Sequence, residues 1–210
     1  REGFKAVSML ICERHIPKNY RRADTGKRYW AVSEGLEVLH PERFAMVRKD
    51  VLSKALTRGT QVHAIFAEIL ATRAKIPGYA FELKKVPGVL RGYATGLYDW
   101  ADKHNVIPRK IEYSSVWERW NVAGTADTEA YYGRERLIII GELKSGIEER
   151  LNRVQVQIYG QMEAYREAKA YLLIYVDKEG RVKEKWVQPS PHDIAWFCAG
   201  IGVLNGRMNG

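Results

Sequence analysis

The sequence has only two cysteines in 210 residues, Cys12 and Cys198, and no CxxC pair. Two thiols cannot provide the four ligands of a cysteine-bound zinc ion or iron–sulfur cluster within one chain. We therefore expect no iron–sulfur cluster. So few cysteines also favour an intracellular, cytoplasmic protein with free thiols over a secreted, disulfide-stabilised one.

Long apolar segments are absent as well. Uninterrupted apolar runs extend over only a few residues, as in Leu137–Ile140, whereas a transmembrane helix requires about 20. The opening residues REGFKAVSMLICERH have no small-residue cleavage site and no long apolar region. We therefore expect neither a signal peptide nor a membrane partner.

Positive charge is in excess, since 34 Lys and Arg residues outnumber 25 Asp and Glu residues and give a formal net charge of +9. Such an excess suits a polyanionic partner, because basic side chains neutralise phosphates during nucleic-acid binding. Charge alone does not separate a nucleic-acid-binding protein from other basic proteins. With 46% hydrophobic residues, the chain can bury the core of one globular domain, and we expect a single domain over 1–210.

Hydrophobic periodicity predicts both helices and strands. The predicted helices are 50–74 (with Gly59 as a point where the helix could break), 89–105, 153–169 and 191–204, and the predicted strands are 111–116, 120–131, 136–143, 171–176 and 183–188. The basic, turn-rich residues 13–30 predict a loop or extended arm. This order predicts an α/β (α+β) fold, with a mixed central sheet flanked by helices.

The segment GTADTEAYYGRERLIIIGELKSG, residues 124–146, holds an unusual arrangement of charges. A hairpin turn centred between positions 134 and 135 would place Asp127 directly opposite Glu142, with Cβ atoms about 4.5–5.5 Å apart. Side chains alternate along a strand, so Lys144 would share the face of Glu142. A register slip of one residue would move Glu142 and Lys144 to the other face, so this prediction depends on the turn.

The charges follow the run Leu137–Ile140, which predicts a central strand buried on both faces. Buried charges are costly without partners, and a hard divalent cation would relieve the repulsion between Asp127 and Glu142. Such an ion can polarise a phosphoryl oxygen and activate water, while Lys144 can stabilise the developing negative charge. The pattern therefore indicates phosphodiester hydrolysis. The alternative is a solvated hairpin with an ordinary Glu142–Lys144 surface ion pair.

Four segments, in this order, resemble the PD-(D/E)XK nuclease superfamily and in particular its RecB-like branch. They are RGTQVH (58–63), GTAD (124–127), ELKSG (142–146) and QVQIY (155–159). The resemblance extends over about residues 55–177 and implies a restriction-endonuclease-like core there. A basic N-terminal arm and helix would occupy 1–50, and a C-terminal hairpin strand and helix would occupy 178–210.

The resemblance implies a metal site. Asp127 and Glu142 would bind Mg²⁺ or Mn²⁺ together with the backbone carbonyl of Leu143, and His63 would be an additional ligand. Taken alone, a histidine at the edge of the apolar arc of its helix is more often structural than a ligand. The three other motifs are the reason that we assign His63 to the site.

The resemblance also implies that Lys144 acts on the attacking water and that Gln155 and Tyr159 position the DNA strand or the lysine. These two residues are four apart and so share a helix face. Gln161 and Tyr165 repeat the spacing, and either pair could be ordinary helix surface. The distance from Lys144 favours the first pair.

Two more acids lie near these motifs. Glu68 is about 140° from His63 around its helix and is expected to be solvated. Glu112, on the first strand of the predicted core, could be a further acid near the metal, but we expect a plain cross-strand partner.

The arm interleaves cations and aromatic residues. Cations suit phosphates and aromatic rings suit exposed bases, and a solvated loop fits about equally well. The candidate nucleic-acid-binding residues of the arm are Arg21, Arg22, Lys27 and Arg28.

The sequence therefore predicts a metal-dependent nuclease acting on single- or double-stranded DNA, as an endonuclease or exonuclease. A second hypothesis is a structure-specific endonuclease of the Holliday-junction type, acting as a homodimer. A third is a non-catalytic DNA-binding protein that retains the nuclease fold, although such a protein would not need to keep His63, Asp127, Glu142 and Lys144 together.

Overall fold

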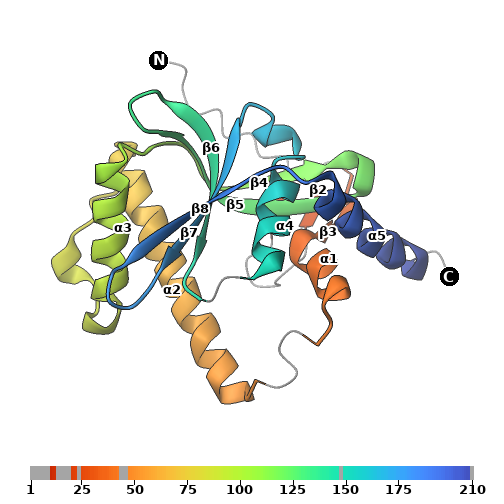
Figure 1. The fold of residues 1–210 in the computed structure, drawn as a ribbon, viewed down its shortest axis with the longest axis horizontal. Coiled ribbons are helices and arrows are strands. Elements are labelled where there is room, and N and C mark those ends of the chain that lie inside the picture. The colour runs from red at the N-terminus through yellow and green to blue at the C-terminus, as the bar shows by residue number, and fades with distance from the viewer. Residues whose placement is uncertain (1–9, 13–19, 23–24, 43–46, 147–148, 209–210) are drawn as a thin grey trace.

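The fold is a mixed β-sheet covered by helices on both faces, which confirms the predicted fold class (Figure 1). It is seen in a computed structural model that describes residues 10–12, 20–22, 25–42, 47–146 and 149–208. None of the helices in these ranges has both the length and the apolarity that a membrane span requires.

Eight strands form the sheet in the described residues, in the order β1-β2-β3-β5-β6-β7-β8, with β4 beside β5. The β3–β5 and β6–β7 pairs are parallel and the others are antiparallel. The strands are β1 (Leu10–Cys12), β2 (Tyr20–Arg22), β3 (Arg28–Ala31), β4 (Ile107–Trp117), β5 (Val122–Tyr132), β6 (Leu137–Lys144), β7 (Ala170–Val176) and β8 (Val182–Val187).

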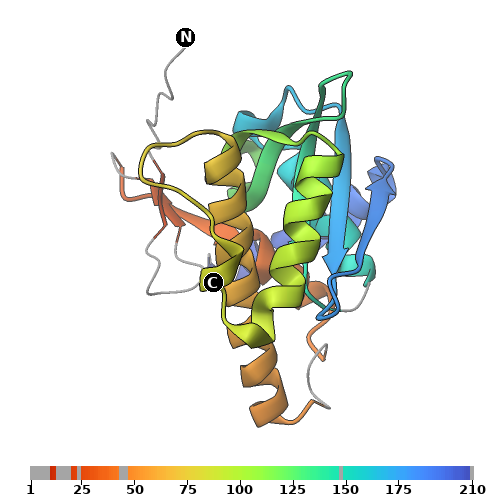
Figure 2. The ribbon, with the colours of Figure 1, turned by 90° about the vertical axis from the view of Figure 1, so that its left-hand side faces the viewer.

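The helices divide between the two faces of the sheet. α2 and α3 lie side by side over one face, and α1, α4 and α5 gather over the other (Figures 1 and 2). The α-helices are α1 (Val32–Leu39), α2 (Lys49–Arg73), α3 (Arg91–Lys103), α4 (Arg150–Tyr159) and α5 (Pro191–Met208). Short 3₁₀ helices occupy Leu83–Lys85, Gly88–Leu90, Glu118–Trp120 and Glu163–Tyr165.

The central strands are buried on both faces, as the apolar run in β6 predicts. In β7, Leu172 and Ile174 belong to the core under α2 and α3, whereas Leu173 packs in the core under α1, α4 and α5. In β6, Ile139 and Ile140 divide between the same two cores. This alternation follows from the two-residue period of a strand, and it fixes which face each later side chain of β6 occupies.

β5 has a gap in its pairing that shapes the site. β4 pairs with one edge of β5 from Val122 to Tyr131. The other edge is shared, because β6 pairs with residues 128–132 and β3 pairs with Val122 and Ala123. In the part of the chain that the structure describes, residues 124–127 have no strand partner on this second edge, which leaves room for side chains from other elements.

One predicted helix is much shorter in the structure. The helix predicted over 153–169 ends at Tyr159, with Gly160 as its C-cap residue. A Cβ atom on Gly160 would lie 2.3 Å from the Tyr171 hydroxyl, so glycine allows Tyr171 of β7 to pack against the end of the helix. Gln161 and Tyr165 therefore do not share a helix face, and Tyr165 is buried with its hydroxyl donating to the Tyr113 carbonyl. α2 continues through Gly59 without a break.

The predicted loop over 13–30 also contains regular structure. Tyr20–Arg22 and Arg28–Ala31 are strands β2 and β3, and β3 joins the main sheet through Trp30 and Ala31. Tyr29, Trp30 and Ala31 are buried, so part of the basic arm is anchored by apolar packing. Residues 13–19, 23 and 24 lie outside the described residues.

α3 packs unusually close to the β7–β8 turn. A Cβ atom on Gly92 would lie 1.9 Å from the Lys178 carbonyl oxygen, and one on Gly96 would lie 2.2 Å from that of Gly180. Both neighbours are backbone atoms, which cannot rotate away as a side chain can. Glycine at these two helix positions thus lets α3 lie directly against the turn.

We expect Gly96→Ala to lower the free energy of unfolding by about 2 kcal/mol or more, because the new methyl group overpacks against backbone. Gly202→Ala in α5 is the matched control, since its Cβ would meet no described atom within 4 Å. The control should be neutral or stabilising by about 0.5–1 kcal/mol. Urea denaturation of both variants measures the difference, and equal stabilities would contradict the close packing.

Candidate metal centre

The β5–β6 hairpin has the register that the sequence predicts. Thr128 lies opposite Gly141 and Tyr132 lies opposite Leu137, with the turn between them. One step beyond the last ladder pair, the same register places Asp127 opposite Glu142. Both carboxylates are buried, with 6% and 3% of their residue surfaces exposed. The two acids of the sequence motif are therefore neighbours in a nearly dry environment.

The Asp127 carboxylate takes the place of a missing ladder bond. Its Oδ2 accepts a hydrogen bond from the Leu143 backbone N–H at 2.6 Å. The N–H and C=O of one strand residue point to the same side, so the Leu143 carbonyl also faces the β5 edge of β6. The role of the Leu143 carbonyl as a metal ligand remains a prediction.

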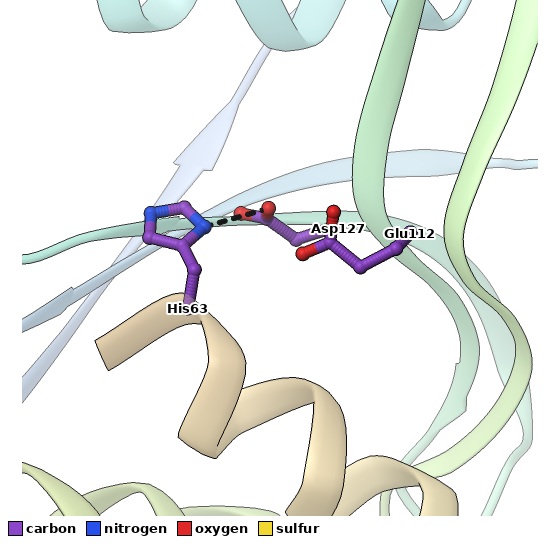
Figure 3. A group of neighbouring side chains, drawn as sticks. All are labelled: His63, Glu112 and Asp127. Carbon is purple, nitrogen blue, oxygen red and sulfur yellow. Dashed lines mark hydrogen bonds and ion pairs between the residues drawn. The ribbon is translucent and has the colours of Figure 1, made fainter. Parts of the chain in front are cut away.

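His63 reaches the same carboxylate from α2. Its Nδ1 lies 2.8 Å from Asp127 Oδ1, and Figure 3 shows the ring directed at Asp127. The neighbours Val62 and Phe66 are buried in the core between α2 and the sheet, and this packing fixes the helix face from which His63 projects. His63, which the sequence placed at the edge of the apolar arc of its helix, thus contacts Asp127, which lies 64 positions further along the chain.

The charges at this contact shift the proton affinities of both partners. Burial lowers the pKa of His63, but the Asp127 carboxylate and its hydrogen bond, together with the Glu142 charge, raise the pKa to about 9. Burial alone would raise the pKa of Asp127, yet His63, Lys144 and the Leu143 N–H hold it below its ordinary value. At neutral pH the metal-free site therefore contains an imidazolium–carboxylate pair.

Glu142 is held by a second group of side chains. Its Oε1 accepts hydrogen bonds from Lys144 Nζ and Gln155 Nε2, each at 2.9 Å. Lys144 also donates to Gln155 Oε1 at 2.9 Å, and Gln155 donates to the Tyr159 hydroxyl at 2.8 Å. The structure thus brings Gln155 and Tyr159 to the Glu142–Lys144 pair, which favours them over Gln161 and Tyr165 as the site pair.

One oxygen of Glu142 is left without a partner. Glu142 Oε2 is buried and has no hydrogen bond to any described residue. Burial and the neighbouring Asp127 charge raise the pKa of Glu142 to about 7, although Lys144 and His63 oppose this shift. An unpartnered buried carboxylate oxygen is costly, so the site as it stands favours either a proton or a cation here.

Tyr159 depends on a glycine in β5. A Cβ atom on Gly124 would lie 2.6 Å from the Tyr159 ring and 2.9 Å from a methyl group of Val32. The first glycine of the GTAD segment therefore allows the ring to pack against β5. Burial and the Glu142 charge raise the pKa of Tyr159 well above its ordinary value, so its hydroxyl stays protonated.

Glu112 belongs to this site, contrary to our expectation of a plain cross-strand partner. The pairs on either side of it are Ile111–Thr128 and Tyr113–Ala126, so Glu112 lies opposite Asp127. One ligand atom from each of His63, Glu112 and Asp127 lies within 4.8 Å of the others (Figure 3). The β4–β5 register was not predicted from the sequence, and it is this register that pairs Glu112 with Asp127.

The basic arm lies near the site, but its cations are partly neutralised. Arg22 and Lys27 pair with the two oxygens of Glu118 at 3.1 and 2.8 Å, and Arg28 pairs with Glu34 at 3.3 Å. Arg21 is exposed and donates a long 3.5 Å hydrogen bond to the Gly26 carbonyl. Binding of phosphates by these four cations remains a prediction, and three of them would have to share their charge with a carboxylate.

A groove of about 1660 Å³ runs over the site. One wall is the exposed face of α2, whose N-terminal half projects beyond the sheet (Figures 1 and 2). The lining includes His63, Glu112 and Lys144, and also Tyr20 and Arg58. The groove is thus lined by charged side chains from three elements, namely His63 of α2, Glu112 of β4 and Lys144 of β6.

Comparison with known proteins leaves the chain without a family. Neither a protein-family model nor a curated protein matches it. Among solved structures it is similar to the crystal structure of SSO0001, with a TM-score of 0.35 and 14% identity over 67% of this chain and 74% of that chain. The function proposed below therefore rests on the residues of the site.

Because the pKa of Glu142 is raised, removing its carboxyl group should change the stability of the metal-free protein in a pH-dependent way. Its folded-state pKa of about 7 lies above the ordinary value near 4.5, so the unfolded chain ionises first and the folded metal-free protein loses stability as pH rises between these values. We expect the unfolding free energy of Glu142→Gln to rise relative to that of the wild type across this pH interval, by at most about 3 kcal/mol.

Chemical denaturation in EDTA at several pH values measures this difference. The comparison at pH 4 is the internal control, because both proteins are then uncharged at this position. A difference in unfolding free energy that stays constant from pH 4 to pH 8 would mean that Glu142 ionises as easily in the folded protein as in the unfolded chain.

Proposed function

We propose that this protein is a Mg²⁺- or Mn²⁺-dependent nuclease that hydrolyses DNA phosphodiester bonds. The observation that carries this proposal is the convergence of His63, Asp127, Glu142 and Lys144 from α2, β5 and β6 on one buried site beside a groove. The four segments that resemble the PD-(D/E)XK nucleases supply all of these residues.

The donor set fits a divalent cation. Carboxylate oxygens suit Mg²⁺ and Mn²⁺, and an imidazole nitrogen is a better ligand for Mn²⁺ than for Mg²⁺. The unpartnered Glu142 Oε2 and the repulsion between Glu142 and Asp127 are what a cation at this position would relieve. Asp127, Glu142, the Leu143 carbonyl and His63 would hold the ion. When bound, such an ion lowers the pKa of water and polarises a phosphoryl oxygen.

Lys144 has the placement of a residue that stabilises developing negative charge. Its ammonium group is mostly buried and held between Glu142 Oε1 and Gln155 Oε1, which leaves one of its three N–H donors free of these two bonds. A fixed cation in a site of low dielectric constant needs little reorganisation to stabilise a pentavalent phosphorane-like charge distribution. Gln155 and Tyr159 act by holding the lysine and Glu142 in place.

The groove gives a nucleic-acid strand access to this site. Arg58 and Lys144 contribute cations to its lining and Tyr20, Tyr79 and Tyr113 contribute aromatic rings, a combination suited to phosphates and bases. The net charge of +9 supports association with a polyanion. DNA is therefore the substrate that we propose, with the basic arm as a further contact.

We expect Asp127→Asn and Glu142→Gln each to lower DNA cleavage at least about a hundredfold, because each removes a charged ligand from the site. Lys144→Met should lower turnover similarly while Mn²⁺ binding, measured by calorimetry, persists. Lys169→Met is the matched control, since this lysine is exposed and its backbone N–H donates to the Ile138 carbonyl at the opposite end of β6.

The assay uses labelled linear, circular, single-stranded and branched DNA with Mg²⁺ or Mn²⁺, and with EDTA as the blank. Full cleavage in EDTA would overturn the metal requirement. Salt-dependent binding to DNA without cleavage of any substrate would instead identify a non-catalytic DNA-binding protein, and cleavage restricted to branched DNA would identify a junction-specific endonuclease.

His63 predicts proton release on metal binding. A ligand nitrogen must be unprotonated, and the pKa of about 9 means that most His63 side chains carry a proton at pH 8 in the metal-free protein. We expect Mn²⁺ binding at pH 8 to release about one proton more from the wild type than from His63→Gln.

Calorimetric titrations in two buffers of different ionisation enthalpy give the number of protons released. Glu142, with its pKa of about 7, is mostly ionised at pH 8 and adds little to the difference. Equal proton release from the two proteins would show that His63 is a structural partner of Asp127 and not a metal ligand.

A further inference from the structure

Three carboxylates lie in a row across three adjacent strands. The β4–β5 register places Glu112 opposite Asp127, and Glu142 on β6 lies one residue beyond the last β5–β6 pair, Thr128–Gly141. The two strands that carry these glutamates lie on opposite edges of β5, so the glutamates flank Asp127 from two sides. The resemblance to PD-(D/E)XK nucleases accounts for Asp127 and Glu142, and it leaves Glu112 without a role.

The side chains define one cation position on the β4 side of Asp127. One ligand atom each from His63, Glu112 and Asp127 lies within 4.8 Å of the others. Ligands about 2.1–2.2 Å from one ion lie up to about 4.4 Å apart, so small side-chain adjustments would close the set around a cation. Figure 3 shows the three side chains converging from α2 and two strands.

A separate observation points to a position on the β6 side. Glu142 is buried, and its Oε2 has no partner among the described residues. The cluster of His63, Glu112 and Asp127 does not include this oxygen, which belongs to the other neighbour of Asp127. An unpartnered carboxylate oxygen on one side and a three-ligand cluster on the other give two places for a cation, with Asp127 between them.

We propose that Glu112 is the ligand of a second divalent cation, held by His63, Glu112 and Asp127. This ion would lie beside the first position, formed by Asp127, Glu142 and the Leu143 carbonyl, and His63 would then belong to the second ion. The inference rests on the proposed metal-dependent function. Asp127 bridges the two positions, and sites of this kind hold ions about 3.5–4 Å apart. Glu112 lines the groove and its residue surface is exposed, so the second cation faces the space in which a phosphate would lie.

The balance of charge is consistent with two ions. Glu142 is paired with Lys144, whereas Glu112 and Asp127 add two negative charges beside a single histidine. A cation on the β4 side would lie between the carboxylates of Glu112 and Asp127.

The test is the number of Mn²⁺ ions bound by the whole chain, without DNA. Calorimetry and elemental analysis should give two ions for the wild type and one for Glu112→Gln, and the exchange-coupled electron paramagnetic resonance signal of a manganese pair should be lost in the variant. Glu68→Gln is the matched control, because Glu68 is exposed on the same groove and outside the cluster. It should bind two ions.

Glu112 has a left-handed backbone conformation, with φ of 46°, so a second variant guards against local misfolding. Glu112→Asn removes the charge with a residue that tolerates this conformation well, and it should also bind one ion. Circular dichroism confirms that each variant is folded.

The other outcomes separate this inference from the nuclease proposal. One ion in both the wild type and Glu112→Gln would overturn the role of Glu112 and leave the nuclease proposal intact. One ion in the wild type and none in the variant would overturn the second position and make Glu112 a ligand of a single ion. No ion in the wild type would overturn the metal-dependent function itself.

Discussion

The site depends on one buried carboxylate, that of Asp127. One of its oxygens accepts the Leu143 N–H of β6 and the other contacts His63 of α2, so a single side chain joins three elements. This is possible because β5 has no strand partner along this part of its second edge in the described residues. One carboxylate oxygen accepts the hydrogen bond that a backbone carbonyl of a paired strand would otherwise accept. The other oxygen ties α2 to the sheet through His63.

The same carboxylate makes the site electrostatically incomplete. Asp127 and Glu142 are both nearly dry, and their repulsion raises the pKa of Glu142 to about 7 despite Lys144. Hydrogen bonds from Gln155 and Lys144 satisfy only one oxygen of Glu142. A fold that retains such an arrangement loses stability in the metal-free state, and a bound cation would recover it, which links metal binding to stability as well as to chemistry.

The hairpin register and the central burial of β6 could be predicted from the sequence, because each depends on short-range periodicity and one turn. The approach of Gln155 to Lys144 was implied only by the resemblance of the motifs. Other features could not be predicted. The end of α4 at Tyr159 is one of them, since Gly160 there packs against Tyr171 on another element, β7. The arm forms strands because β3 finds a partner in β5, about 90 residues away along the chain.

The sequence by itself determined the hairpin on which Asp127, Glu142 and Lys144 lie and their positions along it, because a tight hairpin fixes its own register. Only the tertiary structure decided that His63 contacts Asp127 and that Glu112 lies beside them. It also decided that Glu118 and Glu34 form ion pairs with cations of the basic arm. These contacts link segments far apart in the chain, and their geometry is set by how α2 and β3 pack on the sheet, which local periodicity does not specify.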